Sequence, residues 1–312
     1  MPMHPEAEAL MKLMDAAGLG YYPGSTPESM RAAMGAAAAN GAFNVHPVHG
    51  VEDRLLPAAD GAVPVRVYRP NAEPALPVVV WFHGGGWVTG SIETHDHLCR
   101  LLCDDTGAIV VSVDYRLAPE TKFPGAVDDC VAAYAWVSEH AAELGGDRAR
   151  VALGGDSAGG NLAAVVALVA RDTGLPGPTV QILVYPVTDY EFESRSMIDN
   201  ATGYFLEAEE MRWFFDHYAR TPDDFGDWRM SPLRAPDVAG LAPAVVITAE
   251  FDPLRDQGEA YGHRLQQAGG HAQVLRGDGL FHGFFGMHPF LPPARHAWDT
   301  AIGALRATFG MV

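Results

Sequence analysis

Cysteine is scarce in this chain of 312 residues, which has only Cys99, Cys103 and Cys130. Their number is odd and no two of them form a C-x-x-C pair, so the sequence predicts no disulfide framework. A chain of this length buries on the order of 75% of its unfolded surface, so it needs neither a disulfide nor a metal to hold it together. We therefore expect small buried thiols.

Basic residues are also few. Lys and Arg number 21 against 39 Asp and Glu, which gives a formal net charge of −18. A strongly acidic protein is a poor partner for phosphate backbones and for anionic lipid, so we expect no nucleic-acid partner. The simplest role of this charge is to keep the protein in solution.

Long apolar runs are absent. The longest uncharged apolar run covers residues 162–170, far short of the roughly 20 residues of a membrane-spanning helix. The sequence starts M-P-M-H-P-E-A-E-A-L, without the basic region and apolar stretch of a secretory signal. We therefore expect a cytoplasmic protein with no stable membrane insertion.

Apolar residues nonetheless make up 48% of the chain, arranged as short Val- and Ile-rich runs that alternate with helical patterns. Several of the short runs are apolar at consecutive positions, which is typical of parallel strands covered on both faces. The alternation predicts an α/β fold with a mostly parallel sheet flanked by helices. The expected strands are 63–68, 78–82, 108–113, 150–153, 180–185, 244–249 and 272–275. The expected helices are 94–104, 125–142, 160–172, 207–220, 256–268 and 293–309.

Two segments fall outside this alternation. Residues 1–45 are rich in Met and Ala and indicate two or three small helices. Residues 188–228 are rich in aromatic residues and are longer than a strand–helix crossover requires. Long insertions of this kind commonly form lids or pocket walls. Most of the catalytic chemistry is therefore expected from residues 46–187 and 229–312.

A nucleophile motif follows the expected strand 150–153. Residues 155–159 read G-D-S-A-G, which matches G-x-S-x-G, and a helical pattern comes next. This strand–turn–helix context is the one that a nucleophile elbow requires. Ser157 would stand at a sharp, strained turn, where the following helix N-terminus favours developing negative charge.

A second glycine-rich motif follows the strand 78–82, where residues 83–87 read H-G-G-G-W. Acyl transfer passes through a tetrahedral intermediate whose negative oxygen needs preorganised N–H donors. Consecutive glycines allow bare backbone N–H groups to approach a substrate. We expect donors from Gly84 and Gly85, with Ala158 as a third.

A serine needs a base and an acid that orients it, in the order Ser, Asp or Glu, His in this fold. Asp252 follows the strand 244–249, and His282 follows the strand that begins at residue 272. Both would lie at the carboxyl edge of the sheet with Ser157. Asp256 is expected to cap the next helix.

Other chemistries lose support on inspection. Gly155 and Gly160 have the spacing of a P-loop, but Asn161 stands where the lysine must be. His95 and His97 form an H-D-H pair without clear further metal ligands, and His83 is expected to hydrogen-bond locally. We expect no metal and no organic cofactor.

In combination, these motifs resemble the hormone-sensitive lipase family of α/β-hydrolases, the microbial esterases with H-G-G-G and G-D-S-A-G. The resemblance extends from about residue 50 onward. The matching segments, in order, are 83–87, 115–120 (Y-R-L-A-P-E), 155–161, 185–186 (Y-P), 252–256 and 282–284.

The resemblance implies an α/β-hydrolase fold of about eight strands with a helical cap, built from residues 1–45 and the insertion 188–228. It implies a carboxylesterase that works through an acyl-enzyme, with Ser157 as nucleophile, His282 as base and Asp252 as its orienter. We expect it to act on short- to medium-chain esters, since the aromatic insertion suggests an apolar but closed pocket. A dimer formed through an edge strand at residues 272–275 would also be in keeping with the family.

Several alternatives remain open. The same triad could serve an amidase, a lactonase or a deacetylase, and a small-molecule binding protein could use the same fold. Trp87, Leu206 and Phe214 are candidate walls of the substrate pocket, although each could equally serve packing.

Overall fold

The computed structural model describes residues 2–40, 45–59 and 61–311. Within them one sheet of eight strands has the order β1-β2-β4-β3-β5-β6-β7-β8. Pairing is antiparallel for β1 with β2 and for β2 with β4, and parallel for every other neighbouring pair. The strands are β1 (Gly50–Ala58), β2 (Gly61–Arg69), β3 (Leu76–Phe82), β4 (Ile109–Val113), β5 (Gly146–Asp156), β6 (Gln181–Val184), β7 (Ala244–Phe251) and β8 (Ala272–Phe281). The predicted fold class, a mostly parallel α/β sheet, is confirmed.

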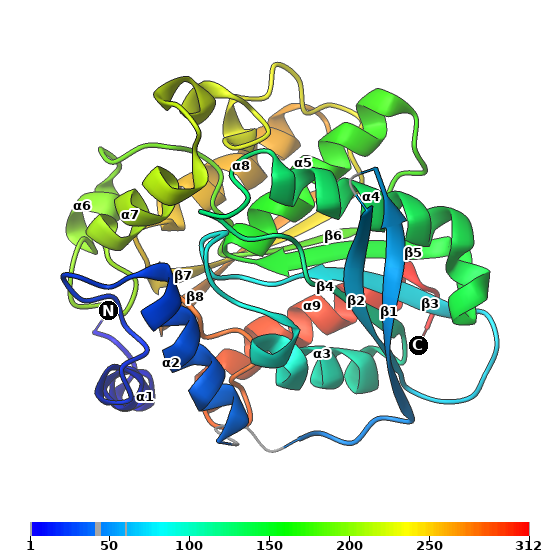
Figure 1. The fold of residues 1–312 in the computed structure, drawn as a ribbon, viewed down its shortest axis with the longest axis horizontal. Coiled ribbons are helices and arrows are strands. Elements are labelled where there is room, and N and C mark those ends of the chain that lie inside the picture. Colours follow the sequence, from blue (N-terminus) through cyan, green and yellow to red (C-terminus); the bar gives the residue numbers. More distant parts are fainter. Residues whose placement is uncertain (1, 41–44, 60, 312) are drawn as a thin grey trace.

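Helices cover both faces of this sheet (Figure 1). Helices α4, α5 and α8 pack on one face, and α3 and α9 pack on the other. The α-helices of the described residues are α1 (Pro5–Ala16), α2 (Pro27–Ala39), α3 (Ile92–Thr106), α4 (Gly125–His140), α5 (Ala158–Thr173), α6 (Arg195–Asp199), α7 (Ala208–Tyr218), α8 (Arg255–Gln267) and α9 (Arg295–Thr308). No helix in these residues is long and apolar enough to cross a membrane.

The central strands are buried on both faces, as their uninterrupted apolar sequences predict. Every residue of β3 and of β4 is buried. The outer strand β1 differs, because most of its residues are exposed or half-buried and it carries charged residues at positions 52–54. An edge strand that faces water lacks the apolar pattern of a buried strand, which is why sequence reasoning missed β1.

The two segments outside the alternation lie together. Helices α1 and α2 come from the N-terminal segment and α6 and α7 from the insertion, and all four gather at the same end of the molecule, at the left of Figure 1. Residues 1 and 41–44 of the N-terminal segment lie outside the described residues. Helix α2 is docked by Arg31, which donates hydrogen bonds of 2.7 Å to the carbonyls of Val88 and Ala118 and pairs with Glu120.

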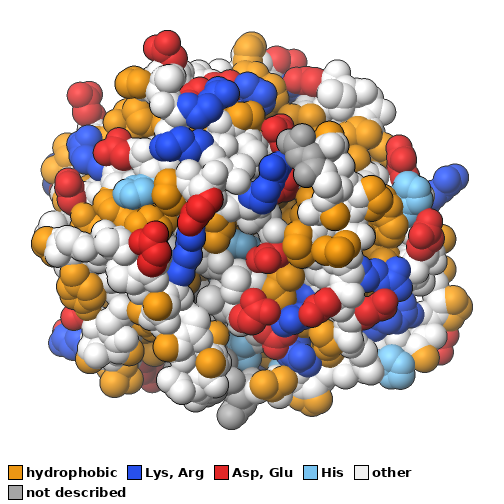
Figure 2. Space-filling view, in the orientation of Figure 1, with side chains coloured by type: hydrophobic (Ala, Val, Ile, Leu, Met, Phe, Trp, Pro, Cys, Tyr) orange, Lys and Arg blue, Asp and Glu red, His pale blue; other side chains and the backbone are white. Residues whose placement is uncertain are grey.

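The three cysteines are buried and free, as predicted. Cys99 and Cys103 lie on α3, and Cys130 lies on α4. On the face of the protein shown in Figure 2, acidic side chains are interspersed with basic ones and with apolar patches. The excess negative charge is therefore not gathered into one area of that face.

Candidate active site

Ser157 stands at the predicted sharp turn between β5 and α5. Its backbone has φ +56°, a left-handed value that is uncommon for a residue with a side chain. The glycines on either side are sterically required. A Cβ at Gly155 would lie 2.3 Å from the carbonyl oxygen of Gly159, and a Cβ at Gly159 would lie 1.9 Å from that of Phe82. The strained elbow therefore depends on the G-x-S-x-G spacing.

His282 connects Ser157 to Asp252. Its Nε2 lies 3.0 Å from Ser157 Oγ, and its Nδ1 lies 2.7 Å from Asp252 Oδ2. All three side chains are buried, and Asp252 is completely so. The other carboxylate oxygen of Asp252 accepts the backbone N–H of Leu254 at 2.8 Å. Three residues separated by up to 125 positions thus form one hydrogen-bonded line, with the geometry of a serine, a general base and an orienting acid.

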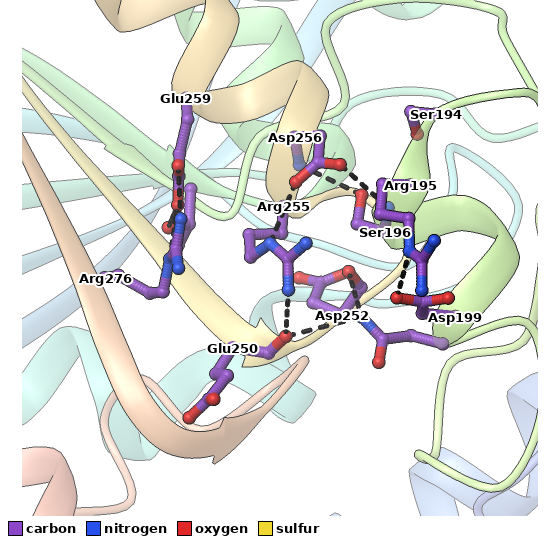
Figure 3. A network of polar contacts seen from close by, with 12 residues as sticks. Ser194, Arg195, Ser196, Asp199, Glu250, Asp252, Arg255, Asp256, Glu259 and Arg276 are labelled. Carbon is purple, nitrogen blue, oxygen red and sulfur yellow. Dashed lines mark hydrogen bonds and ion pairs between the residues drawn. The ribbon is translucent and has the colours of Figure 1, made fainter. Parts of the chain in front are cut away.

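The loop that carries Asp252 is held by α6 of the insertion (Figure 3). Ser196 and Asp256 exchange hydrogen bonds, from Ser196 N–H to Asp256 Oδ2 at 2.8 Å and from Asp256 N–H to Ser196 Oγ at 3.0 Å. The Ser196 hydroxyl also donates to the carbonyl of Pro253 at 2.8 Å, and the Asn200 amide donates to that of Asp252 at 3.1 Å. The insertion therefore fixes the backbone on both sides of the acid.

The expectation that Asp256 caps the next helix is wrong. Helix α8 has Leu254 at its N-cap position and begins at Arg255, so Asp256 already belongs to the first turn. Its carboxylate instead binds α6 and accepts a hydrogen bond from Arg255 Nε at 2.9 Å.

Tyr185 supports the histidine from the side. Its backbone has φ +33°, and the following Pro186 belongs to the Y-P pair noted in the sequence. The ring centroids of Tyr185 and His282 are 4.4 Å apart. Burial raises the pKa of the Tyr185 phenol well above its usual value, so this ring stays neutral beside the base.

The glycine loop after β3 rests on buried polar side chains. His83 is fully buried, its Nδ1 lies 2.8 Å from the carbonyl of Gly84, and its own carbonyl accepts the Tyr115 hydroxyl at 2.6 Å. Burial lowers the pKa of His83 to about 3, so the ring is neutral at ordinary pH. The expectation that His83 bonds locally is confirmed.

The structure turns the N–H of Gly84 toward a side chain of the protein. It faces His95 Nε2 at 3.3 Å, which accepts it when that nitrogen carries no proton. Gly84 is packed tightly there, because a Cβ would lie 2.4 Å from Asp156 Oδ2. The loop therefore presents its next two residues, Gly85 and Gly86, which have φ +118° and +58°.

Sequence reasoning missed two residues of this site, His95 and Gly86. His95 Nε2 lies 3.3 Å from Asp156 Oδ2, and the Trp81 indole donates to Asp156 Oδ1 at 3.2 Å. Burial acts to raise the pKa of Asp156, but His95, His83 and the Trp81 hydrogen bond together outweigh it, and the pKa is lowered. Gly86 was visible as the third glycine of the motif. His95 looked like half of an incomplete metal pair, and only the fold brings it to Asp156.

A cavity of about 250 Å³ opens above Ser157 and His282. Its walls come from the N-terminal helices, the glycine loop, α7 and the loop after β8. Besides Ser157 and His282, the residues that form these walls include Met14, Leu19, Met30, Met34, Gly84, Gly85, Gly86, His95, Asp156, Tyr185, Phe205, Leu206, Glu210, Met211, Phe214, Phe285 and Met287. The walls are thus largely apolar, with few polar side chains.

Two of the three candidate wall residues line this cavity. Leu206 and Phe214 do so, as predicted, whereas Trp87 does not. Trp87 has φ +60°, is fully buried and stacks on Tyr218 with ring centroids 4.5 Å apart. Its indole packs between α7 and the glycine loop, so Trp87 is a packing residue. Among the described residues, no group of three His, Cys, Asp or Glu side chains could hold a metal ion.

The chain is similar to known ester hydrolases along most of its length. The sequence pattern of a family described as alpha/beta hydrolase fold matches residues 79–286. Carboxylic ester hydrolase LipN of Mycobacterium tuberculosis is 45% identical over 268 residues, which are 84% of this chain and 71% of that protein. Ethyl acetate hydrolase of Pseudomonas putida is 41% identical over 261 residues, which are 82% of each.

Solved structures show the same relationship. A hyperthermophilic esterase from the archaeon Pyrobaculum calidifontis superposes with a TM-score of 0.92 at 41% sequence identity, over 98% of this chain and 99% of that one. The chain therefore belongs to the α/β-hydrolase fold family and is a carboxylic ester hydrolase similar to hormone-sensitive lipase.

Proposed function

We propose that Ser157, His282 and Asp252 are the catalytic triad of this carboxylesterase and that it works through an acyl-enzyme. The observation that carries the proposal is the hydrogen-bonded line from Ser157 Oγ through His282 to Asp252, at the floor of an apolar cavity. His282 Nε2 takes the proton of Ser157 as Oγ attacks the ester carbonyl, and Asp252 holds the Nδ1–H of the resulting imidazolium.

The remaining steps return the enzyme to its starting state. His282 gives its proton to the leaving alcohol as the carbon–oxygen bond breaks, which leaves the acyl group on Ser157. Water then attacks that acyl carbonyl as His282 takes its proton, and His282 returns this proton to Ser157 Oγ as the bond to Oγ breaks and the carboxylic acid leaves. The G-D-S-A-G sequence at residues 155–159 supports placing the chain in the branch of the family that carries this motif.

The oxyanion of both intermediates would be held by the backbone N–H groups of Gly85, Gly86 and Ala158. We assign Gly86 rather than Gly84 to this role because the Gly84 N–H faces His95 Nε2 within the protein. Gly85 and Gly86 both line the cavity, and Ala158 begins the helix that follows the nucleophile. Each such donor contributes about 3 kcal/mol to lowering the barrier.

The substrate would be a short- to medium-chain ester. The cavity volume of about 250 Å³ is smaller than the roughly 300–1,000 Å³ of pockets that hold drug-sized ligands. One relative is named for ethyl acetate, a short ester. Described residues of both the N-terminal segment and the insertion line the cavity. We assign residues 1–45 and 188–228 to a cap over a catalytic domain of residues 46–187 and 229–312.

Two further properties belong to the same proposal. Three free, buried cysteines support a reducing compartment, the cytoplasm. Strand β8 is the outer strand of the sheet beyond β7, and an open edge of this kind can pair with that of a second copy to form a dimer. Size-exclusion chromatography with light scattering tests the dimer, and a mass of one chain at all concentrations contradicts it.

The triad and the chain length are tested together with p-nitrophenyl esters from C2 to C16. We expect the highest kcat/KM at the short to medium lengths and a loss of several orders of magnitude for Ser157→Ala at every length. A Ser157→Ala variant as active as the parent would refute the triad, and an optimum at C16 would refute the assigned chain length.

A further inference from the structure

The cavity contains one acidic side chain that the proposed reaction does not use. Glu210 lines the cavity from α7 and is only 7% exposed. The other carboxyl group of the lining, Asp156, is engaged by His95 and Trp81. Among the described residues that line the cavity, none is Lys or Arg. Glu210 therefore faces a largely apolar space that it shares with no Lys or Arg of the described lining.

Burial without a cation is costly for a carboxylate. The polar support of Glu210 is a hydrogen bond with the backbone of Glu207, at the start of α7. This single bond does not compensate for burial, which raises the pKa of Glu210 to about 8. The carboxyl group consequently keeps a capacity to pair with a positive charge that enters the cavity.

The position of Glu210 on α7 relates it to the reacting centre. Phe214 follows it by four residues and so lies on the same face of the helix, about 6 Å further along the axis. The Phe214 ring packs against Gly86, because a Cβ there would lie 2.2 Å from the ring. A group bound at Glu210 would thus sit about one helical turn from the proposed oxyanion loop, within the length of a small ester.

We propose that Glu210 binds a positively charged amine on the substrate, so that this enzyme selects small esters carrying an ammonium group. The inference rests on the proposed function, since the bound ester must reach Ser157. Phe205, Met211 and Phe214 of the same lining offer ring faces and a polarisable sulfur, which suit an alkylammonium ion. The net charge of −18 raises the local concentration of cations and disfavours anionic esters.

A purely structural role for Glu210 makes a different prediction. As the third residue of α7, it could serve only to cap the helix through the backbone of Glu207. Loss of such a cap would impair the hydrolysis of charged and neutral esters alike. A binding role of Glu210 therefore differs from a capping role in one measurable property, the discrimination between a charged and a neutral ester of the same shape.

The test compares acetylcholine with 3,3-dimethylbutyl acetate, its uncharged isostere, by pH-stat titration of the released acid. The measured quantity is the ratio of the two kcat/KM values for the parent, for Glu210→Gln and for Glu209→Gln. Glu209 precedes Glu210 on α7 and is exposed, so its substitution makes the same charge change outside the cavity. We expect the ratio to fall at least about tenfold in Glu210→Gln at pH 9.5, and to stay at the parental value in Glu209→Gln.

The parent protein supplies a second readout without any substitution. Its ratio should rise several-fold between pH 7 and pH 9.5, as Glu210 loses its proton. The other titratable groups that line the cavity are His95, His97, Asp156, Tyr185 and His282, and burial keeps the Tyr185 phenol neutral over this pH range by raising its pKa. His282 acts on both esters in the same way, so its protonation cancels in the ratio.

The outcomes are distinguishable. An unchanged ratio in Glu210→Gln, a parental ratio that is flat with pH, or no hydrolysis of acetylcholine beside rapid hydrolysis of the neutral ester would each overturn the inference alone. If the parent hydrolyses the neutral ester no faster than Ser157→Ala does, the proposed function itself fails.

Discussion

The contact between α6 and the loop of Asp252, the proposed triad acid, allows a quantitative prediction about Ser196. Its side chain is fully buried, and its hydroxyl joins the carbonyl of Pro253 to the N–H of Asp256. Ser196→Ala leaves both backbone groups without this partner. Each lost partner costs about 1–2 kcal/mol, so we expect the free energy of unfolding to fall by about 2–4 kcal/mol. Urea titration measures this loss.

Catalysis should suffer as well, because these bonds flank Asp252. Removing the function of the orienting acid of a catalytic triad lowers kcat by up to ~10⁴-fold. A loosened loop that still carries the carboxylate should cost a part of this, about tenfold, in kcat and with little change in KM. Steady-state kinetics with p-nitrophenyl acetate below the midpoint of unfolding separates this effect from partial unfolding.

A matched control lies on the same short helix. Arg195 and Asp199 pair with each other at 2.5 Å, but their side chains are 79% and 44% exposed. Figure 3 shows them beside the hydrogen-bonded pair Ser196 and Asp256. Asp199→Asn should change the free energy of unfolding by less than about 0.5 kcal/mol and leave kcat at the parental value. The reasoning is refuted if Ser196→Ala behaves like Asp199→Asn in both measurements.

Three further changes have predictable results. Gly86→Ala would place a methyl group 2.2 Å from the Phe214 ring and should lower kcat/KM by about tenfold or more. Combining it with Phe214→Ala should restore part of the loss. An unchanged kcat/KM in Gly86→Ala would contradict the packing of Phe214 against Gly86. The pKa of Glu210 is raised to about 8, so the folded state binds this proton more tightly than the unfolded state does. The stability that the proton contributes is fully present below the unfolded pKa of about 4.5 and is lost as the pH rises through 8. Urea unfolding at pH 5, 7 and 9 should show a loss on the order of 3–5 kcal/mol in the parent that is smaller in Glu210→Gln, and parallel pH profiles would disprove it. Arg31→Met removes the hydrogen bonds of α2 to two backbone carbonyls as well as the ion pair with Glu120, and it should expose the N-terminal helices to limited proteolysis. Glu120→Gln alters only a partner that is 57% exposed and should have a much smaller effect. Equal protection of the parent and both variants would speak against the docking role of Arg31.

Much of the candidate site was predictable because a parallel sheet imposes a simple rule. Its strands all end at one edge, so residues that follow different strands meet there. Ser157 after β5, Asp252 at the end of β7 and His282 after β8 were identified by this rule together with their order in the chain. The fold class was predicted from the alternation of short apolar runs with helical patterns. Among the described residues, the exposed outer strand β1 is the one strand of the sheet that this alternation did not predict.

The direction of individual groups was not predictable. Gly84 and Gly85 are identical in sequence, yet the N–H of Gly84 is bonded to His95, which belongs to a helix eleven residues later in the chain. Trp87 follows the glycines directly, but its positive φ and its stacking on Tyr218 remove it from the cavity. Neither outcome is a property of the local sequence, because each depends on a partner brought up by the fold.

The sequence by itself determined the fold class and pointed to the proposed nucleophile, base and acid, since these depend on residue type, order and position after a strand. Tertiary structure alone decided which N–H groups remain available, which side chains line the cavity and how the insertion holds the acid. Glu209 and Glu210 show the reason most simply. They are chemically the same and adjacent, but the rotation of about 100° per helical residue leaves the first in water and buries the second in the cavity wall.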